Sequence, residues 1–168
     1  SIPVDSWVQN ENVSGGRIIG EACHAIDTVT FLTGSPPVRV FAESIGGPSA
    51  PAITDDQCFI TIRHANGSIS SIAYLAGGDR SMPKERIEAL GGGKMAVIDD
   101  FREVTLASGG KVRKYKTSGK GHVEEVKAFV DTLRSGENPP IEWKDLRSVS
   151  LASILAVQSI REGIPFEV

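Results

Sequence analysis

A histidine and two carboxylates lie close together near the start of the chain, at spacings typical of one helical surface. With successive residues about 100° apart on a helix, Arg17, Glu21, His24 and Thr28 fall within a sector of roughly 60°. Asp27 lies at the edge of this row. An imidazole can carry a proton near neutral pH, and a carboxylate three residues away could orient its ring. The spacing fits a proton relay, and it equally fits a solvated helix face with an ordinary surface histidine.

The helix that would position these groups extends from Gly15 to Gly34. Gly34 stands where a glycine in the left-handed conformation commonly ends a helix. On the side opposite His24, the same spacing aligns a mostly apolar stripe that would enter a core. The stripe consists of Ile18, Ala22, Ile26, Val29 and Thr33. The pattern therefore predicts one amphipathic helix with a buried face and a polar face.

Alternating apolar and polar residues predict a run of strands after this helix, and apolar helical spacing predicts two further helices near the C-terminal end. Asn66-Gly67 between two alternating runs indicates a hairpin. We expect strands over 38–44, 58–63, 68–75, 84–90, 95–98, 103–107 and 111–116, and helices over 121–134 and 143–161. This order predicts an α+β fold with a mostly antiparallel, six- to seven-stranded open sheet and about three helices packed on one face.

The bulk composition is that of one globular domain of ordinary size. The chain has 168 residues, of which 40% are hydrophobic and 23% charged. We expect residues 15–168 to form a single domain and residues 1–14 to be a lead-in segment. The net charge of −3 gives no electrostatic reason to expect nucleic acid or an anionic membrane as a partner. Cys23 and Cys58 are expected to be buried free thiols, which indicates a cytoplasmic protein.

Two familiar kinds of site find no support in the sequence. Gly91-Gly92-Gly93-Lys94-Met95-Ala96 matches the glycine spacing of a dinucleotide fingerprint, but a strand-like run follows where the fingerprint needs a helix. We therefore expect a glycine turn without cofactor binding there. His24, His64 and His122 are far apart in the sequence, and the spaced Cys and His motifs of metal sites are lacking. We expect no metal site and interpret His64 as a hairpin-tip residue.

A polar loop and a helix start offer further groups that could contact a ligand. Arg80 lies in the loop Asp79-Arg80-Ser81, with Lys84 a few residues beyond, and both could hydrogen-bond a polar ligand. A solvated hairpin end is the alternative interpretation of this loop. His122 could contact the same pocket, and a capping or surface role is equally compatible with its position.

Several segments in a fixed order resemble one known family. The resemblance rests on residues 15–27, Phe31-Leu32-Thr33-Gly34, 84–88, 91–93, 99–101, Lys120-Gly121-His122 and 159–165. Together they resemble the C-terminal domain of the glucose–fructose oxidoreductase, inositol dehydrogenase and MocA (Gfo/Idh/MocA) family. The match covers nearly the whole chain after about residue 14.

This resemblance implies a reaction that two domains share. In the family, an N-terminal Rossmann domain binds NAD or NADP, and hydride passes between the nicotinamide and a carbinol carbon, commonly of a sugar or cyclitol. A lysine of the N-terminal domain acts with the histidine of a His-x-x-Asp helix on the hydroxyl proton. His24 and Asp27 match that histidine and aspartate. Many relatives also have an aspartate four residues before the histidine; this chain has Gly20 there, and Glu21 could substitute with a longer reach.

The expected function is the C-terminal substrate-binding domain of an NAD(P)-dependent oxidoreductase that acts on a sugar- or cyclitol-like CH–OH group. The resemblance implies His24 as the proton-relay residue, a homo-oligomer formed through the open sheet face, and no cofactor bound by this domain alone. Since the chain starts at Ser1 without methionine, we expect it to be an inactive part of a longer protein. The substrate-binding candidates are Arg17, Thr28, Arg80, Lys84 and His122. The alternative is a non-catalytic binding or dimerisation module that kept the fold.

Overall fold

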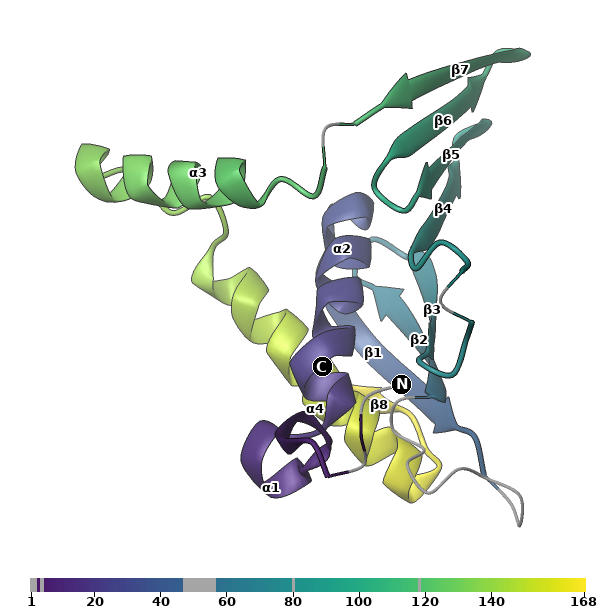
Figure 1. Ribbon diagram of the computed structural model, residues 1–168, viewed down its shortest axis with the longest axis vertical. Helices are drawn as coiled ribbons and strands as arrows, with labels where there is room; N and C mark the ends of the chain where they lie inside the picture. Colours follow the sequence, from purple (N-terminus) through teal and green to yellow (C-terminus); the bar gives the residue numbers. More distant parts are fainter. Residues whose placement is uncertain (1–2, 4, 47–56, 80, 118) are drawn as a thin grey trace. The chain divides into compact units, whose positions relative to one another are not determined.

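The computed structural model describes residues 3, 5–46, 57–79, 81–117 and 119–168 (Figure 1). The chain falls into two compact units. The first comprises Ser1–Gly77 and Ile141–Val168, and the second comprises Gly78–Pro140.

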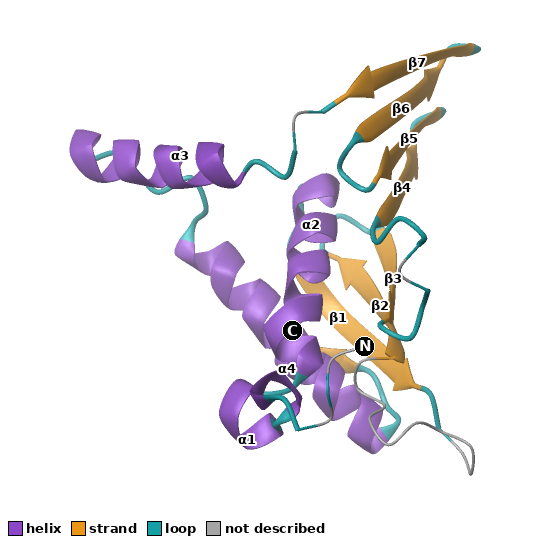
Figure 2. Cartoon of the chain, viewed as in Figure 1, coloured by secondary structure: helices purple, strands orange, loops and turns teal. Residues whose placement is uncertain are grey.

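The first unit is a four-stranded antiparallel sheet with two long helical segments packed on one face (Figure 2). Its helical elements are η1 (Trp7–Gln9), α1 (Glu11–Ser14), η2 (Ile18–Ala22), α2 (Cys23–Thr33) and α4 (Trp143–Glu162). Its strands are β1 (Pro37–Ser44), β2 (Gln57–His64), β3 (Ile69–Leu75) and β8 (Phe166–Glu167). The strand order is β3-β2-β1-β8. The helices cover one face of the sheet, and the other face carries exposed side chains.

The core of this unit follows from side-chain alternation in the strands. Along β2, every second side chain points inward, so that Ile60 and Ile62 are fully buried while Thr61 between them is exposed. The helices contribute apolar residues at intervals of three or four. The buried apolar residues are Ile18, Ala22, Ile26, Val40, Ala42, Cys58, Ile60, Ile62, Ile72, Val149, Ala152 and Ala156. The predicted stripe of the first long helix therefore enters the core, with Val29 and Thr33 half-buried at its end.

One buried hydroxyl joins α4 to the edge of the sheet. Strand β8 pairs with β1 only opposite Arg39 and Val40. Beyond this short pairing, the Ala42 amide donates a 3.0 Å hydrogen bond to the Ser159 hydroxyl, which itself donates at 2.7 Å to the Ile164 carbonyl. Ser159 is fully buried. It therefore satisfies a strand amide that the two-residue strand β8 does not reach.

We expect Ser159→Ala to lower the free energy of unfolding of this unit by about 1–3 kcal/mol, because it leaves the buried Ala42 amide and the Ile164 carbonyl without their partner. Urea unfolding measures the change. Ser150→Ala is the matched control, since the exposed Ser150 hydroxyl only donates to a carbonyl of its own helix. Equal stability of the two variants would contradict this role for Ser159.

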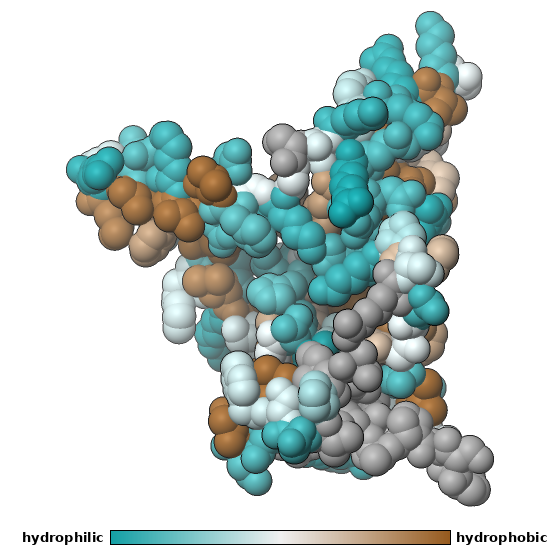
Figure 3. Space-filling model, in the orientation of Figure 1, coloured by the Kyte–Doolittle hydropathy of each residue, from teal (hydrophilic) through white to brown (hydrophobic). Residues whose placement is uncertain are grey.

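The second unit is an antiparallel meander followed by a helix. Its elements are β4 (Arg86–Gly91), β5 (Lys94–Asp99), β6 (Glu103–Ser108), β7 (Lys111–Lys116) and α3 (His122–Ser135), with sheet order β4-β5-β6-β7. No described residue of this unit is fully buried. Figure 3 shows apolar side chains gathered along one side of α3. The large exposed apolar residues of α3 are Val123, Val126, Phe129 and Leu133.

The structure confirms the predicted α+β class and antiparallel pairing. The predicted strands and later helices occur within a few residues of their expected ranges, and Gly67, with a φ of 86°, forms the expected hairpin turn. The strands are shared between two sheets, and β8 adds an eighth strand of only two residues. The lead-in segment contains the short helices η1 and α1, which have no apolar periodicity from which they could be predicted. Among the described residues, no helix is long and apolar enough to cross a membrane.

Candidate functional site

The helix that carries His24 contains a π turn near its start, after one regular hydrogen bond from the Gly20 amide to the Gly16 carbonyl. In η2, the Cys23 amide donates to the Ile18 carbonyl five residues back, whereas a regular α-helix bonds to the fourth residue back. A π turn therefore holds one more residue than an α turn. That extra residue rotates everything before it by about 100° around the helix axis, relative to a continuous helix. The α-helix proper, α2, follows and ends at Gly34, whose φ of 62° confirms the predicted left-handed cap.

The π turn moves Arg17 away from the face on which the sequence places it. Uniform helical spacing puts Arg17 beside His24, but Arg17 is only 8% exposed while His24 is exposed. The Arg17 guanidinium donates a hydrogen bond to the Tyr74 hydroxyl of β3 and lies 5.6 Å from the centre of the Tyr74 ring. The expectation that Arg17 shares the polar face is thus wrong, because the spacing assumed an unbroken α-helix.

The remaining polar residues of the predicted row do lie on the first turns of the helix. Glu21 and His24 are exposed, whereas Asp27 and Thr28 are half-buried. The Thr28 hydroxyl donates a 2.8 Å hydrogen bond to the His24 carbonyl, so its oxygen keeps lone pairs that can accept a hydrogen bond from a ligand. The helix therefore presents an imidazole, carboxylates and a hydroxyl together.

The thiol next to His24 reports the local electrostatics. Burial raises the pKa of Cys23, and the negative charges of Glu21 and Asp27 raise it further, against the opposing hydrogen bond from the His24 backbone. Cys23 therefore remains a thiol at neutral pH. Since both carboxylates act on the same sulfur, the beginning of α2 is a locally acidic surface.

Sequence reasoning missed one residue on this surface. Phe31 follows Thr28 by three residues and His24 by seven, so it lies on the same side of α2. Its side chain is 81% exposed. The same helical spacing that groups His24 with Thr28 could have found Phe31. An exposed aromatic ring beside polar groups is a common feature of sites that bind small molecules.

His64 lies beside the hairpin turn, as expected, and it is a buried structural residue. It ends β2 at the hairpin, yet only 1% of it is exposed. Its Nδ1 lies 3.0 Å from the Ser35 carbonyl, which can only accept, so Nδ1 carries the proton. Nε2 then accepts from the Ser70 hydroxyl at 2.6 Å. We assign this tautomer from the hydrogen-bond network. Both ring nitrogens are engaged within the fold, which leaves none for a ligand.

The other predicted ligand-binding residues belong to the second unit or lie outside the described residues. Arg80 is outside them. Lys84 is exposed, with its Nζ 3.9 Å from a Glu85 carboxylate oxygen. His122 is exposed at the start of α3, with its Nδ1 3.9 Å from a Glu125 carboxylate oxygen. Neither side chain is held rigidly by these long contacts.

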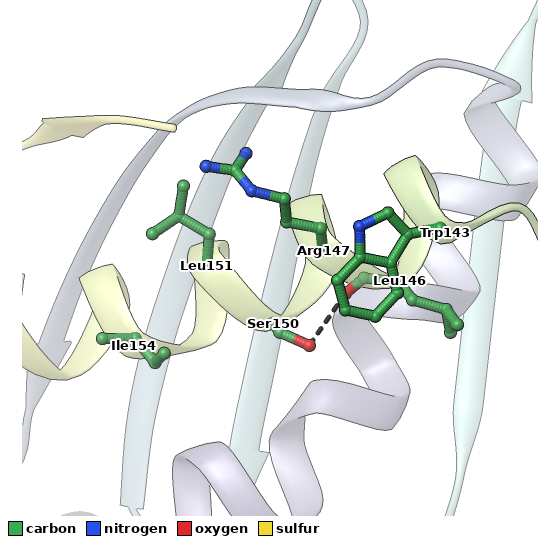
Figure 4. A pocket seen from close by; sticks show the side chains of 6 residues that line it. All are labelled: Trp143, Leu146, Arg147, Ser150, Leu151 and Ile154. Atoms are coloured by element: carbon green, nitrogen blue, oxygen red, sulfur yellow. Dashed lines mark hydrogen bonds between the residues drawn. The ribbon is translucent and has the colours of Figure 1, made fainter.

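Two further features of the described residues, the glycine motif and a hollow on α4, contain none of the predicted site residues. Gly91 pairs with Lys94 across the β4–β5 turn, which confirms a glycine turn in place of a dinucleotide fingerprint. Among the described residues, no three His, Cys, Asp or Glu side chains cluster as metal ligands would. Figure 4 shows a shallow hollow on α4. It is lined by Trp143, Leu146, Arg147, Ser150, Leu151 and Ile154, and so contains none of the predicted site residues.

Comparison with known proteins identifies one family. The sequence profile of the GFO/IDH/MocA C-terminal domain matches residues 2–93 of the 168. Among curated proteins, myo-inositol 2-dehydrogenase of Thermotoga maritima is 24% identical over 89% of this chain and 48% of its own length.

Solved structures share the fold over the whole chain. Levoglucosan dehydrogenase, in a complex with NADH and levoglucosan, superposes with a TM-score of 0.82 at 21% identity, over 99% of this chain and 54% of that one. Aldose-aldose oxidoreductase from Caulobacter crescentus, in a complex with glycerol, superposes with a TM-score of 0.79 at 16% identity, over 100% of this chain and 52% of that one. This chain therefore spans about half the length of the relatives it matches.

Proposed function

Since this chain belongs to the GFO/IDH/MocA C-terminal domain family, we propose that it is the substrate-binding and oligomerisation domain of an NAD(P)-dependent oxidoreductase. The observation that carries the proposal is the exposed imidazole of His24 beside the carboxylates of Glu21 and Asp27 at the start of α2. We take residues 15–168 as this domain, preceded by a lead-in over residues 1–14.

The proposed substrate is a sugar or cyclitol that is oxidised at one CH–OH group. The names of the relatives support this class, since one acts on myo-inositol and another binds levoglucosan. A nicotinamide, when bound, supplies the hydride acceptor. His24 takes the hydroxyl proton through a ring nitrogen as the hydride leaves the carbinol carbon. The Thr28 hydroxyl is proposed to hydrogen-bond a second hydroxyl of the substrate.

The cofactor is proposed to bind a separate Rossmann domain of the full-length protein. A dinucleotide site needs a strand, a glycine turn and a helix in succession, and the Gly91–Gly93 motif of this chain lies between two antiparallel strands. The matched relatives are about twice as long as this chain, which leaves room in them for such a domain. NAD and NADP remain equal candidates here.

Turnover by the full-length protein tests the proposal. We expect NAD+ or NADP+ to be reduced in the presence of at least one member of a panel of pyranoses, anhydrosugars and inositols, as measured by the absorbance of the reduced nicotinamide. The 168-residue chain alone should show no reduction. Reduction by the chain alone would contradict the proposed separation of cofactor and substrate domains.

A second copy of the chain is proposed to cover the open face of the first sheet. This face carries exposed apolar residues on neighbouring strands, including Phe59, Ile69 and Leu75 at 53%, 65% and 48% exposure. Glu43 pairs with Phe59 in the sheet, and Arg63 pairs with Ile69. A face of this kind, with apolar residues and both charges, is able to pair with itself across a two-fold axis.

We expect Phe59→Asp to weaken this self-association by roughly 30- to 700-fold, because a charge replaces an aromatic residue central to the proposed interface. Sedimentation of the full-length protein at several concentrations gives the dissociation constant. Val123→Asp is the control, since Val123 is 77% exposed but lies on α3. If both variants associate as strongly as the wild type, the open sheet face is not the interface.

A further inference from the structure

We infer that Arg17 and Tyr74 are positioning residues that hold the π turn and thereby fix the direction in which His24 faces. The effect on turnover rests on the proposed function, whereas the effect on the π turn does not. Arg17 immediately precedes the turn, and Tyr74 belongs to β3, a strand 57 residues further along the chain. Their contact is thus a tertiary link between the start of this helix and the sheet.

The π turn decides which way Arg17 points. Seven residues separate Arg17 from His24, and at about 100° per residue a regular helix would place both side chains within about 20° of each other. Arg17 would then point outward with His24. The extra residue of the π turn rotates Arg17 by about 100°, and its guanidinium reaches the Tyr74 ring and hydroxyl. Arg17 contacts Tyr74 while His24 remains exposed only when the π turn is present.

The Arg17–Tyr74 contact favours the π turn because it compensates the buried guanidinium for lost water. Arg17 is 8% exposed, and a buried cation is unfavourable unless polar or aromatic groups replace its water. Tyr74 provides both, since its ring lies under the guanidinium and its hydroxyl accepts a hydrogen bond. Removal of the Arg17 guanidinium therefore removes a contact that the π turn permits, and the regular α-helical spacing becomes the better solution.

The residues before the turn are shaped for the same arrangement. Gly15 and Gly16 have φ angles of 78° and 84°, in the left-handed region that favours glycine. A Cβ on Gly15 would lie 3.3 Å from side-chain atoms of Ile19, which is inside the π turn. The chain therefore enters the turn against a packed side chain, which limits how the turn can relax.

Crystal structures of Arg17→Met and Tyr74→Phe in the full-length protein test whether Arg17 and Tyr74 hold the π turn. We expect Arg17→Met to convert η2 to a regular α turn, so that the Cys23 amide bonds four residues back. Tyr74→Phe keeps the ring and is expected to retain the turn in part. If Arg17→Met keeps the bond from the Cys23 amide to the Ile18 carbonyl, the inference is wrong. Should Arg17→Met fail to fold, Tyr74→Phe decides through hydrogen exchange at the Cys23 amide, for which faster exchange is expected.

Steady-state kinetics test whether the π turn positions His24. Misorientation of His24 should lower the kcat of Arg17→Met by about 10- to 100-fold while KM changes less than about 3-fold, and should displace the pH profile of kcat. Arg17→Lys, which restores the cation, should recover part of kcat. Lys127→Met is the matched control, because it removes an exposed cation on α3. A wild-type kcat and pH profile in Arg17→Met would overturn the positioning role. If turnover is lost only in His24→Ala, the proposed function is supported and the positioning role of Arg17 is wrong.

Discussion

Replacing His24 with alanine is expected to lower the kcat of the full-length protein by about 100- to 10,000-fold, the range typical for loss of a general acid–base group. His24 is exposed on α2 and takes no part in the core, so the free energy of unfolding should change little. Binding of the oxidised nicotinamide should be retained, because the proposed cofactor site lies in another domain. Initial rates at saturating cofactor and substrate measure the effect.

The matched control for this variant is Ser150→Ala, since Ser150 is an exposed residue on a different helix, α4, and donates only to the Leu146 carbonyl. It should keep the wild-type kcat. If His24→Ala also keeps the wild-type kcat while the protein turns over its substrate, His24 is not the relay. If neither the wild type nor the variants turn over any polyol, the chain is better described as a binding or dimerisation module.

Replacing Ile60 with alanine is expected to lower the free energy of unfolding by about 3–5 kcal/mol, which is the largest stability effect that we anticipate for a single substitution. Ile60 is fully buried at the centre of β2, where it pairs with Ala42 of β1 and Ile72 of β3. The substitution leaves a cavity and removes contacts with the strands on both sides of β2. The surrounding sheet is closely packed and cannot collapse into this cavity.

Hydrogen exchange of the β1–β2 amides measures this loss within the first unit alone. Thr61→Ala is the neighbouring control, because Thr61 is exposed on the opposite face of the same strand, and its change should stay within about 1 kcal/mol. An Ile60→Ala effect no larger than that of Thr61→Ala would mean that the core of this unit does not lie between the sheet and the helices α2 and α4.

Much of the fold could be predicted because local patterns and tertiary packing agree. Gly34 and Gly67 mark a helix end and a hairpin turn, and both adopt the left-handed conformation that these positions need. The stripe headed by Ile18 and Ala22 enters the core as its spacing indicates. The division of the strands into two sheets carries no local mark, since antiparallel hairpins look alike whichever sheet they join.

The candidate site was less predictable, for physical reasons that can be traced to particular residues. A helical wheel assumes the same rotation of about 100° at every residue. Because it takes no account of the π turn, the wheel placed Arg17 on the wrong face of the helix. Tyr74 lies 57 residues from Arg17, and nothing local links the two. His64, in contrast, shares its parity along β2 with the buried Ile60 and Ile62. That alternation could have predicted its burial, which its place beside Asn66-Gly67 at the hairpin does not reveal.

We propose that the exposed start of α2 forms half of a dehydrogenase active site. A crystal structure of the full-length protein with bound NAD+ or NADP+ would test this proposal. We expect the reactive carbon of the nicotinamide to lie about 6–7 Å from the His24 ring, which leaves room for one CH–OH group between them. A nicotinamide bound far from His24, or a protein to which neither cofactor binds, would show that α2 does not form part of such a site.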